Sequence, residues 1–166
     1  MRKFIFVIIC AVVIILSGCI EVSVSPNNTK KGSAEIKYEQ LCEDFIESLK
    51  SKDIEKMNIL FCDDIKKSHD LSVEIQNMFN FIDGYVVSYS DYTQSTREGD
   101  SYRQGTCIQH HVNVKFRQIK TDNDKTFQLS FYANLIDVDN PNKVGIEFVR
   151  IIDENEREYL VGEYLD

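Results

Sequence analysis

The stretch FQLSFYANL, residues 127–135, alternates between apolar and polar side chains at every step. A period of two residues places alternate side chains on opposite faces of a β-strand. The apolar face consists of Phe127, Leu129, Phe131, Ala133 and Leu135, and the reverse face displays Gln128, Ser130, Tyr132 and Asn134. One buried and one solvated face is typical of an antiparallel sheet that packs on a core from one side.

The same period recurs on both sides of this stretch. Residues 107–119 place Ile108, His110, Val112, Val114 and Phe116 on one face and Gln109, His111, Asn113, Lys115 and Arg117 on the other. Shorter alternating runs cover residues 85–90, 144–152 and 159–164, with turn-rich segments between the runs. We therefore expect four to five antiparallel strands joined by hairpins, with residues 91–105 as a loop or bulged hairpin.

Upstream of residue 84 the period changes to that of a helix. Apolar residues at i, i+3, i+4 and i+7 predict a helix from Tyr38 to about Leu49, a short one over residues 54–61, and a third over residues 71–82 that ends at Gly84. Residues 63–69 have the composition of a polar connection. Three helices followed by strands predict an α+β fold, with three N-terminal helices packed on a curved antiparallel sheet.

The N-terminus has the features of an export signal. Arg2 and Lys3 precede an apolar run over residues 4–15, which ends in Leu16-Ser17-Gly18-Cys19. An uncleaved transmembrane helix is the alternative, but the run of about a dozen residues falls short of the roughly 20 that a bilayer requires. Leu-Ser-Gly-Cys resembles the lipobox of bacterial lipoproteins. The resemblance implies cleavage after residue 18, a lipid on Cys19, and an anchor in the cell membrane at its extracellular face.

Composition limits the remaining classes. We expect residues 19–36 to form a flexible tether and residues 37–166 a single α+β domain. The chain carries 19 basic and 27 acidic residues, a formal net charge of −8, which argues against nucleic acid as a partner. After export three cysteines would remain outside the lipid site: Cys42, Cys62 and Cys107. A Cys42–Cys62 bridge is one alternative, but small buried thiols are favoured.

Five short segments resemble a known group of proteins. They are Ser48-Leu49-Lys50-Ser51-Lys52-Asp53, Phe79-Asn80-Phe81-Ile82-Asp83-Gly84, Ile119-Lys120-Thr121-Asp122, Phe127-Gln128-Leu129-Ser130-Phe131-Tyr132 and Lys143-Val144-Gly145-Ile146-Glu147. Together they resemble an uncharacterised family of Gram-positive lipoproteins, a domain of unknown function with a nuclear transport factor 2-like fold. This likeness covers about residues 38–152. It implies a cone of sheet and helices and, by analogy, a homodimer formed through the sheet, but it transfers no catalytic residue.

Cones of this kind often hold a pocket between the helices and the sheet, and four residues are candidates to line it. Tyr85 and Tyr89 share one face of a strand, and His110 and Arg150 point to the same side as their apolar neighbours. His110 is a candidate base. The structural alternatives are a hydrogen-bonded core histidine and an arginine paired with a buried acid. Asp122-Asn123-Asp124 lacks the glycine and distal glutamate of a calcium loop, so no metal or cofactor is assigned.

Three functions fit these features. The first is a non-enzymatic, membrane-tethered module that binds an unknown protein or small molecule through the cone pocket or the outer sheet face. The second is a small enzyme of the cyclase or isomerase type with His110 as base. The third is an immunity-type protective lipoprotein.

Overall fold

The computed structural model describes residues 33–90, 92–94 and 99–165. The predicted signal peptide, Cys19 and most of the predicted tether lie outside these residues. The described residues belong to one compact unit. It is an α+β fold in which the helices precede an antiparallel sheet, as the change of period at Gly84 predicted.

Four α-helices are present among the described residues. They are α2 (Ser33–Ser51), α3 (Ile54–Leu60), α4 (Asp63–Ser68) and α5 (Leu71–Ile82). Asp53 begins α3 by accepting a 3.0 Å hydrogen bond from the backbone N–H of Lys56. Asp70 begins α5 in the same way through Val73. Because α2 starts at Ser33, the helix extends four residues into the stretch that was expected to be tether.

The prediction that residues 63–69 form a polar connection was wrong, because they contain α4. Only Ile65 of this helix is buried, so no apolar stripe marks it in the sequence. Its support comes from the order of its charges: acids occupy the first turn and lysines the last, which suits the helix dipole.

The sheet has seven strands, not four to five. They are β1 (Val86–Tyr89), β2 (Tyr92–Gln94), β3 (Gly99–Arg103), β4 (Thr106–Thr121), β5 (Thr126–Asp137), β6 (Gly145–Asp153) and β7 (Glu158–Gly162). The order is β1-β4-β5-β6-β7, and every pairing between these strands is antiparallel. A short 3₁₀ helix, η1 (Pro141–Lys143), lies between β5 and β6.

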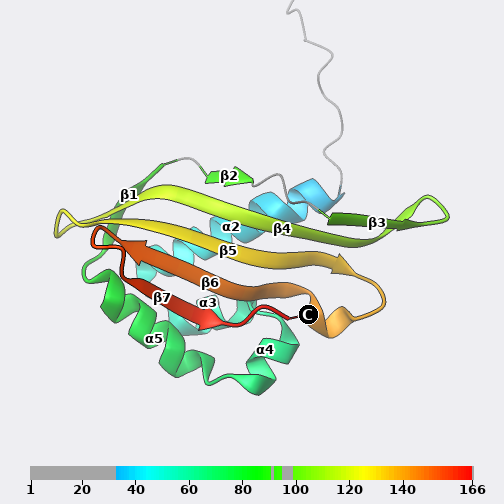
Figure 1. Cartoon of the computed structure of the whole chain (residues 1–166), viewed down its shortest axis with the longest axis horizontal. Coiled ribbons are helices and arrows are strands. Elements are labelled where there is room, and N and C mark those ends of the chain that lie inside the picture. The colour runs from blue at the N-terminus through cyan, green and yellow to red at the C-terminus, as the bar shows by residue number, and fades with distance from the viewer. Residues whose placement is uncertain (1–32, 91, 95–98, 166) are drawn as a thin grey trace, which may run out of the picture. The chain divides into compact units, whose positions relative to one another are not determined.

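The two additional strands come from the segment predicted as a loop or bulged hairpin. Both β2 and β3 pair with β4, so β1, β2 and β3 lie one after another along the same long strand (Figure 1). Their few apolar residues gave no clear alternation. They form because β4 runs for 16 residues and offers hydrogen-bonding groups beyond the reach of β1.

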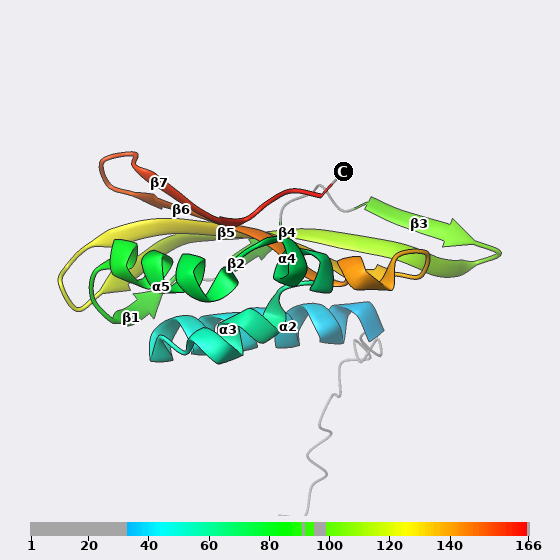
Figure 2. The same cartoon turned by 90° about the horizontal axis from the view of Figure 1, so that it is seen from below.

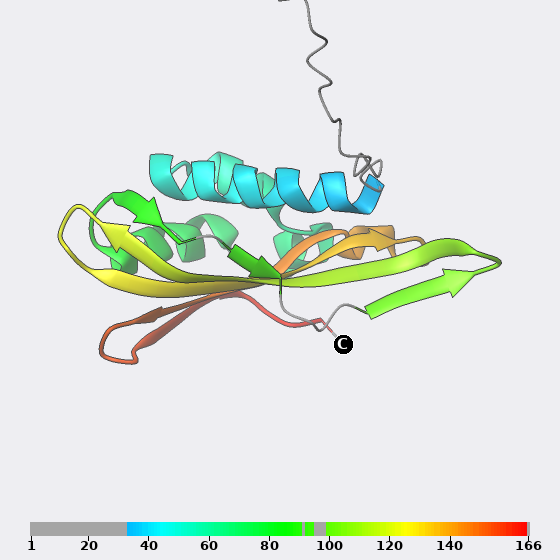
Figure 3. The ribbon, with the colours of Figure 1, turned by 90° about the horizontal axis from the view of Figure 1, so that it is seen from above.

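The helices cover one face of the sheet and leave the other face open, as Figures 2 and 3 show from opposite sides. On the covered face, the ring of Phe45 in α2 lies 4.8 Å from that of Phe131 and 6.2 Å from that of Phe116. All three side chains are fully buried. These rings fill the space over the centre of the sheet, where the resemblance implied a pocket.

Candidate functional site

A groove of about 840 Å³ lies on the open face of the sheet. Figure 1 looks onto this face, with α2 and α3 behind the strands. The groove crosses β4, β5 and β6. Its lining consists of Ser90, Lys115, Phe116, Arg117, Gln118, Gln128, Leu129, Ser130, Arg150 and Ile152.

The charges in this lining have one sign. Lys115, Arg117 and Arg150 are the three ionisable residues, and no carboxylate lines the groove. This is a local reversal in a chain with a formal net charge of −8. Within the described residues neither Lys115 nor Arg117 forms an ion pair, so both ammonium and guanidinium groups are available to a ligand.

A bulge in β4 turns two consecutive side chains toward the groove. Phe116 pairs with Leu129 and Ile119 pairs with Phe127, so β4 has one more residue here than β5. Arg117 and Gln118 are both exposed as a result and both line the groove. Ser90 fixes this point, because its N–H donates to the Gln118 carbonyl and its hydroxyl accepts from the Gln118 N–H.

A second bulge corrects the predicted orientation of Arg150. Alternation placed Arg150 on the apolar side with Ile146. In the structure Tyr132 pairs with Phe148 and Ala133 with Ile146, so Glu147 is an extra residue in β6. The bulge exchanges the faces that follow it, and Arg150 points outward into the groove.

Arg150 has one partner on the open face. Its Nη2 lies 2.6 Å from Oε2 of Glu158 on β7, and both side chains are more than a third exposed. The ion pair raises the pKa of Arg150 and lowers that of Glu158. Pairing with a buried acid was the structural alternative for this arginine. The arginine is paired, but its partner is the exposed Glu158 at the surface beside the groove.

An aromatic cluster adjoins the groove on the same face. The ring of Tyr132 lies 5.4 Å from that of His111, 6.2 Å from that of Phe148 and 5.0 Å from that of Tyr164. Burial raises the pKa of Tyr132, and its hydrogen bond with Tyr164 raises it further. Tyr132 is thus displayed on the outer face as predicted.

Asn134, by contrast, is not displayed on the outer face. It is only 4% exposed and donates to the buried carboxylate of Glu147 at 2.6 Å. Burial raises the pKa of Glu147, whose other oxygen accepts from the N–H of Leu165. This hydrogen-bonded pair occupies the β6 bulge and holds it in place.

The four residues predicted to line a pocket do not come together. Tyr89 pairs with Ile119, nine residues along β4 from His110, which is about 30 Å at the rise of a strand. Tyr85 and Tyr89 instead form cation–π contacts with lysines. Lys52 Nζ lies 4.9 Å from the centre of the Tyr85 ring, and Lys50 Nζ lies 4.8 Å from that of Tyr89. Of the four candidates, Arg150 lines the groove and the others do not.

His110 faces the covered side of the sheet, as predicted, and is 9% exposed. Its Nδ1 is hydrogen-bonded to Asp100 on the neighbouring strand β3. Asp100 also accepts from the hydroxyl of Tyr102 at 3.0 Å, and the contact with His110 lowers the pKa of Asp100. This is the hydrogen-bonded histidine that was the alternative to a catalytic base.

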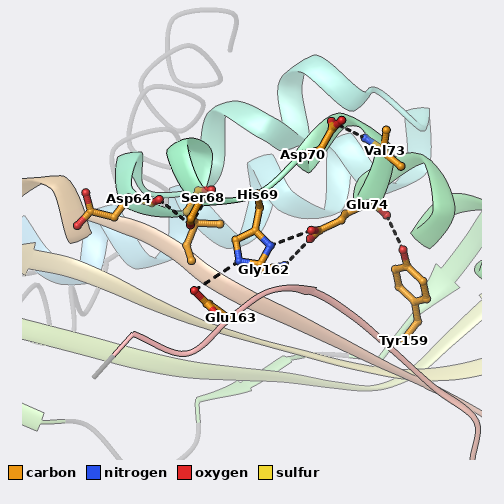
Figure 4. Close-up of polar contacts among 10 residues, drawn as sticks. Asp64, Ser68, His69, Asp70, Val73, Glu74, Tyr159, Gly162 and Glu163 are labelled. Atoms are coloured by element: carbon orange, nitrogen blue, oxygen red, sulfur yellow. Dashed lines mark hydrogen bonds and ion pairs between the residues drawn. The ribbon is translucent and has the colours of Figure 1, made fainter.

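A second polar cluster joins α4 and α5 to the C-terminal segment (Figure 4). His69 Nδ1 lies 2.8 Å from Glu74, and its Nε2 lies 3.6 Å from Glu163. The second oxygen of Glu74 accepts from the N–H of Gly162, and its backbone carbonyl accepts from the hydroxyl of Tyr159. The hydrogen bond to Glu74 raises the pKa of His69. No sequence pattern indicated this cluster, because its C-terminal members lie more than 80 residues from Glu74 along the chain.

The thiols and acidic residues do not form a metal site in the described part of the chain. Cys42, Cys62 and Cys107 are free thiols, and the first two are fully buried, in agreement with the favoured alternative. Burial raises the pKa of Cys42 to about 12. No cluster of three or more His, Cys, Asp or Glu side chains could hold an ion among these residues. None of the described helices is long and apolar enough to span a bilayer.

Comparison with known protein families identifies the family of this chain. The family of the domain of unknown function DUF5104 matches residues 44–154. The chain belongs to this family. The DUF5104 match includes every residue that lines the groove, but it ends before Glu158 and β7. No curated protein matches the sequence.

The sequence contained part of the information for this groove. Lys115 and Arg117 were assigned to the polar face of their strand, and Gln128 and Ser130 to the outer face, which is where they lie. Alternation did not indicate that these side chains meet Arg150, because that requires the bulge at Glu147.

Proposed function

We propose that this member of the DUF5104 family is a non-enzymatic binding module, held at the extracellular face of the cell membrane by lipid on Cys19. The groove on the open sheet face carries the proposal. It is large enough for a small ligand, and its polar and charged groups face solvent without a covering helix. The lipobox-like Leu16-Ser17-Gly18-Cys19 supports the location.

The proposed fold is a variant of the nuclear transport factor 2-like cone. Helices precede an antiparallel sheet and cover one of its faces, which supports this assignment. In cones of the nuclear transport factor 2-like fold, the expected pocket lies between the helices and the sheet. Here aromatic rings occupy that space, so the binding surface is proposed for the opposite face.

The enzyme alternative retains one supporting observation. His110 meets the carboxylate of Asp100, as a positioned base would. However, the ring is almost fully buried and the groove does not include it. We therefore favour the binding module. No contact among the described residues specifically favours the immunity-type alternative.

The test is site-specific photo-crosslinking on intact cells. A photoreactive amino acid at Gln128, inside the groove, should capture a reproducible partner or ligand, identified by mass spectrometry. The matched control carries the same group at Glu55, which is exposed on α3 behind the sheet. Crosslinking to a second copy of the chain would identify the homodimer implied by the resemblance. Equal products from both positions, or none from Gln128, would refute a binding role for the groove.

A further inference from the structure

We infer that the groove recognises a small ligand through an oxyanion, a phosphate or carboxylate group, seated over Ser130 between Lys115 and Arg150. The inference rests on the proposed binding function and adds the ligand's chemistry. The volume of about 840 Å³ is in the range of small-molecule sites, which favours a small ligand over a protein surface.

The register of the sheet places the three residues in one row. Lys115 of β4 is opposite Ser130 of β5, which is opposite Arg150 of β6. Neighbouring strands are about 4.8 Å apart, so the two cations start about 10 Å apart with the hydroxyl midway. Both side chains are long enough to converge on one oxyanion above Ser130, whose O–H is a further donor.

Arg117 strengthens the positive field at the same place. Alternation along β4 places it on the same face as Lys115, inside the groove, and no acidic side chain lines the groove. A cleft lined by one sign of charge concentrates ions of the other sign. The groove therefore favours anions over cations, on a chain that otherwise carries an excess of acidic residues, 27 against 19 basic ones.

Among the described residues, Glu158 is the one carboxylate that pairs with a cation of this row. It contacts Nη2 of Arg150 at 2.6 Å, and arginine has five N–H donors in a planar fork. A ligand oxyanion can therefore bind the remaining donors while the ion pair persists. The Glu158 carboxylate reduces the net positive charge around the proposed oxyanion position. Its removal should therefore tighten anion binding.

The experiment is calorimetric titration of the full chain in detergent micelles with inorganic phosphate and, separately, with citrate. We expect saturable one-to-one binding of at least one of these anions, weakened by added salt. Lys115→Gln should weaken binding about tenfold or more, because it removes a charged donor. Glu158→Gln should tighten binding severalfold. The anion that binds identifies the group as phosphate or carboxylate.

The matched control is Lys120→Gln, an exposed lysine on the same strand outside the groove. It changes net charge equally and should leave the affinity unchanged. If Lys115→Gln does not fold, Ser130→Ala replaces it, and Lys115→Arg should retain binding. Absence of saturable binding by both anions, or equal weakening by the Lys115 and Lys120 variants, overturns the inference. A partner captured from Gln128 together with no anion binding would leave the proposed function standing and reject only the oxyanion.

Discussion

The ionisation of His69 is tied to the fold through its contacts with two carboxylates. Its Nδ1 lies 2.8 Å from the carboxylate of Glu74 and its Nε2 lies 3.6 Å from that of Glu163. The side chain is mostly buried between α4, α5 and the end of the chain. The hydrogen bond to Glu74 raises its pKa, so the folded state binds this proton more tightly than the unfolded state. The stabilisation is complete below the unfolded pKa of about 6.5 and is lost as pH rises through the higher folded pKa.

The corresponding prediction compares His69→Gln with the parent chain. The substitution should lower the free energy of unfolding most at acidic pH, with the deficit shrinking above neutral pH. Urea titrations across this range measure it. Glu163→Gln is the control, and it should give a smaller effect of the same sign because its contact with the ring is longer. A deficit that does not depend on pH would contradict the assignment to a proton on His69.

Replacing Thr121 should raise the free energy of unfolding, the opposite of the effect expected at His69. It is 2% exposed at the end of β4, and its Oγ1 has no hydrogen-bond partner among the described residues. Burying an unpaired hydroxyl is unfavourable, so Thr121→Val should raise the free energy of unfolding by about 1 kcal/mol. Chemical denaturation measures the change. Thr106→Val, exposed at the start of the same strand, should be nearly neutral. A loss of stability at position 121 would show that its hydroxyl is satisfied.

At the scale of elements, β-bulges decide what the sequence could reveal. The period of two residues correctly assigned the buried face of β5 and the outward side chains Lys115 and Arg117 of β4. It assigned Arg150 to the wrong face because one extra residue, Glu147, inverts the alternation that follows it. The buried carboxylate of Glu147 is satisfied there by Asn134 from another strand and by the N–H of Leu165. Contacts between distant segments leave no local pattern.

The same limit applies to the short elements. The helix over residues 71–82 was predicted because five buried residues mark its inner face. In α4 a single buried isoleucine does not define a face. The strands β2 and β3 depend on pairing with β4, and their own composition resembles that of a loop.

Gly162 tests how tightly the β6 bulge is packed. At φ +72° it ends β7, and a Cβ there would lie 2.2 Å from the carbonyl oxygen of Glu147. Gly162→Ala should therefore cost about 2 kcal/mol or more of unfolding free energy, measured by denaturant midpoint. Gly105→Ala is the matched control: its φ is +79°, but nothing lies within 4 Å of the added methyl group. A larger loss of unfolding free energy for Gly162→Ala than for Gly105→Ala measures the effect of the contact with the Glu147 carbonyl. Equal losses would show that the β6 bulge shifts to accommodate the methyl group.

At the scale of the whole molecule, the two faces of the sheet differ in what they carry. The helices lie on one face of the sheet (Figure 3) and bury the aromatic core there. The other face holds the groove and its three cationic side chains. Except for Phe116 and Leu129, the residues that line the groove are not part of the buried core, so most of them can be replaced without opening it. Lys115 and Ser130 are accordingly better probes of function than any residue on the covered side.

The proposed lipid on Cys19 makes the last prediction, which concerns where the whole chain resides. The chain's formal net charge of −8 gives it little attraction to anionic lipid headgroups, so retention should depend on acyl chains. Each buried methylene contributes about 0.8 kcal/mol, and two chains hold a protein far more firmly than one. Cys19→Ala should abolish lipid attachment and the cleavage after residue 18, which mass spectrometry and membrane fractionation detect. The control is Cys10→Ala, inside the predicted signal peptide, which should be processed and retained like the parent. Normal processing and lipid mass in the Cys19 variant would refute the anchor and leave the groove's chemistry untouched.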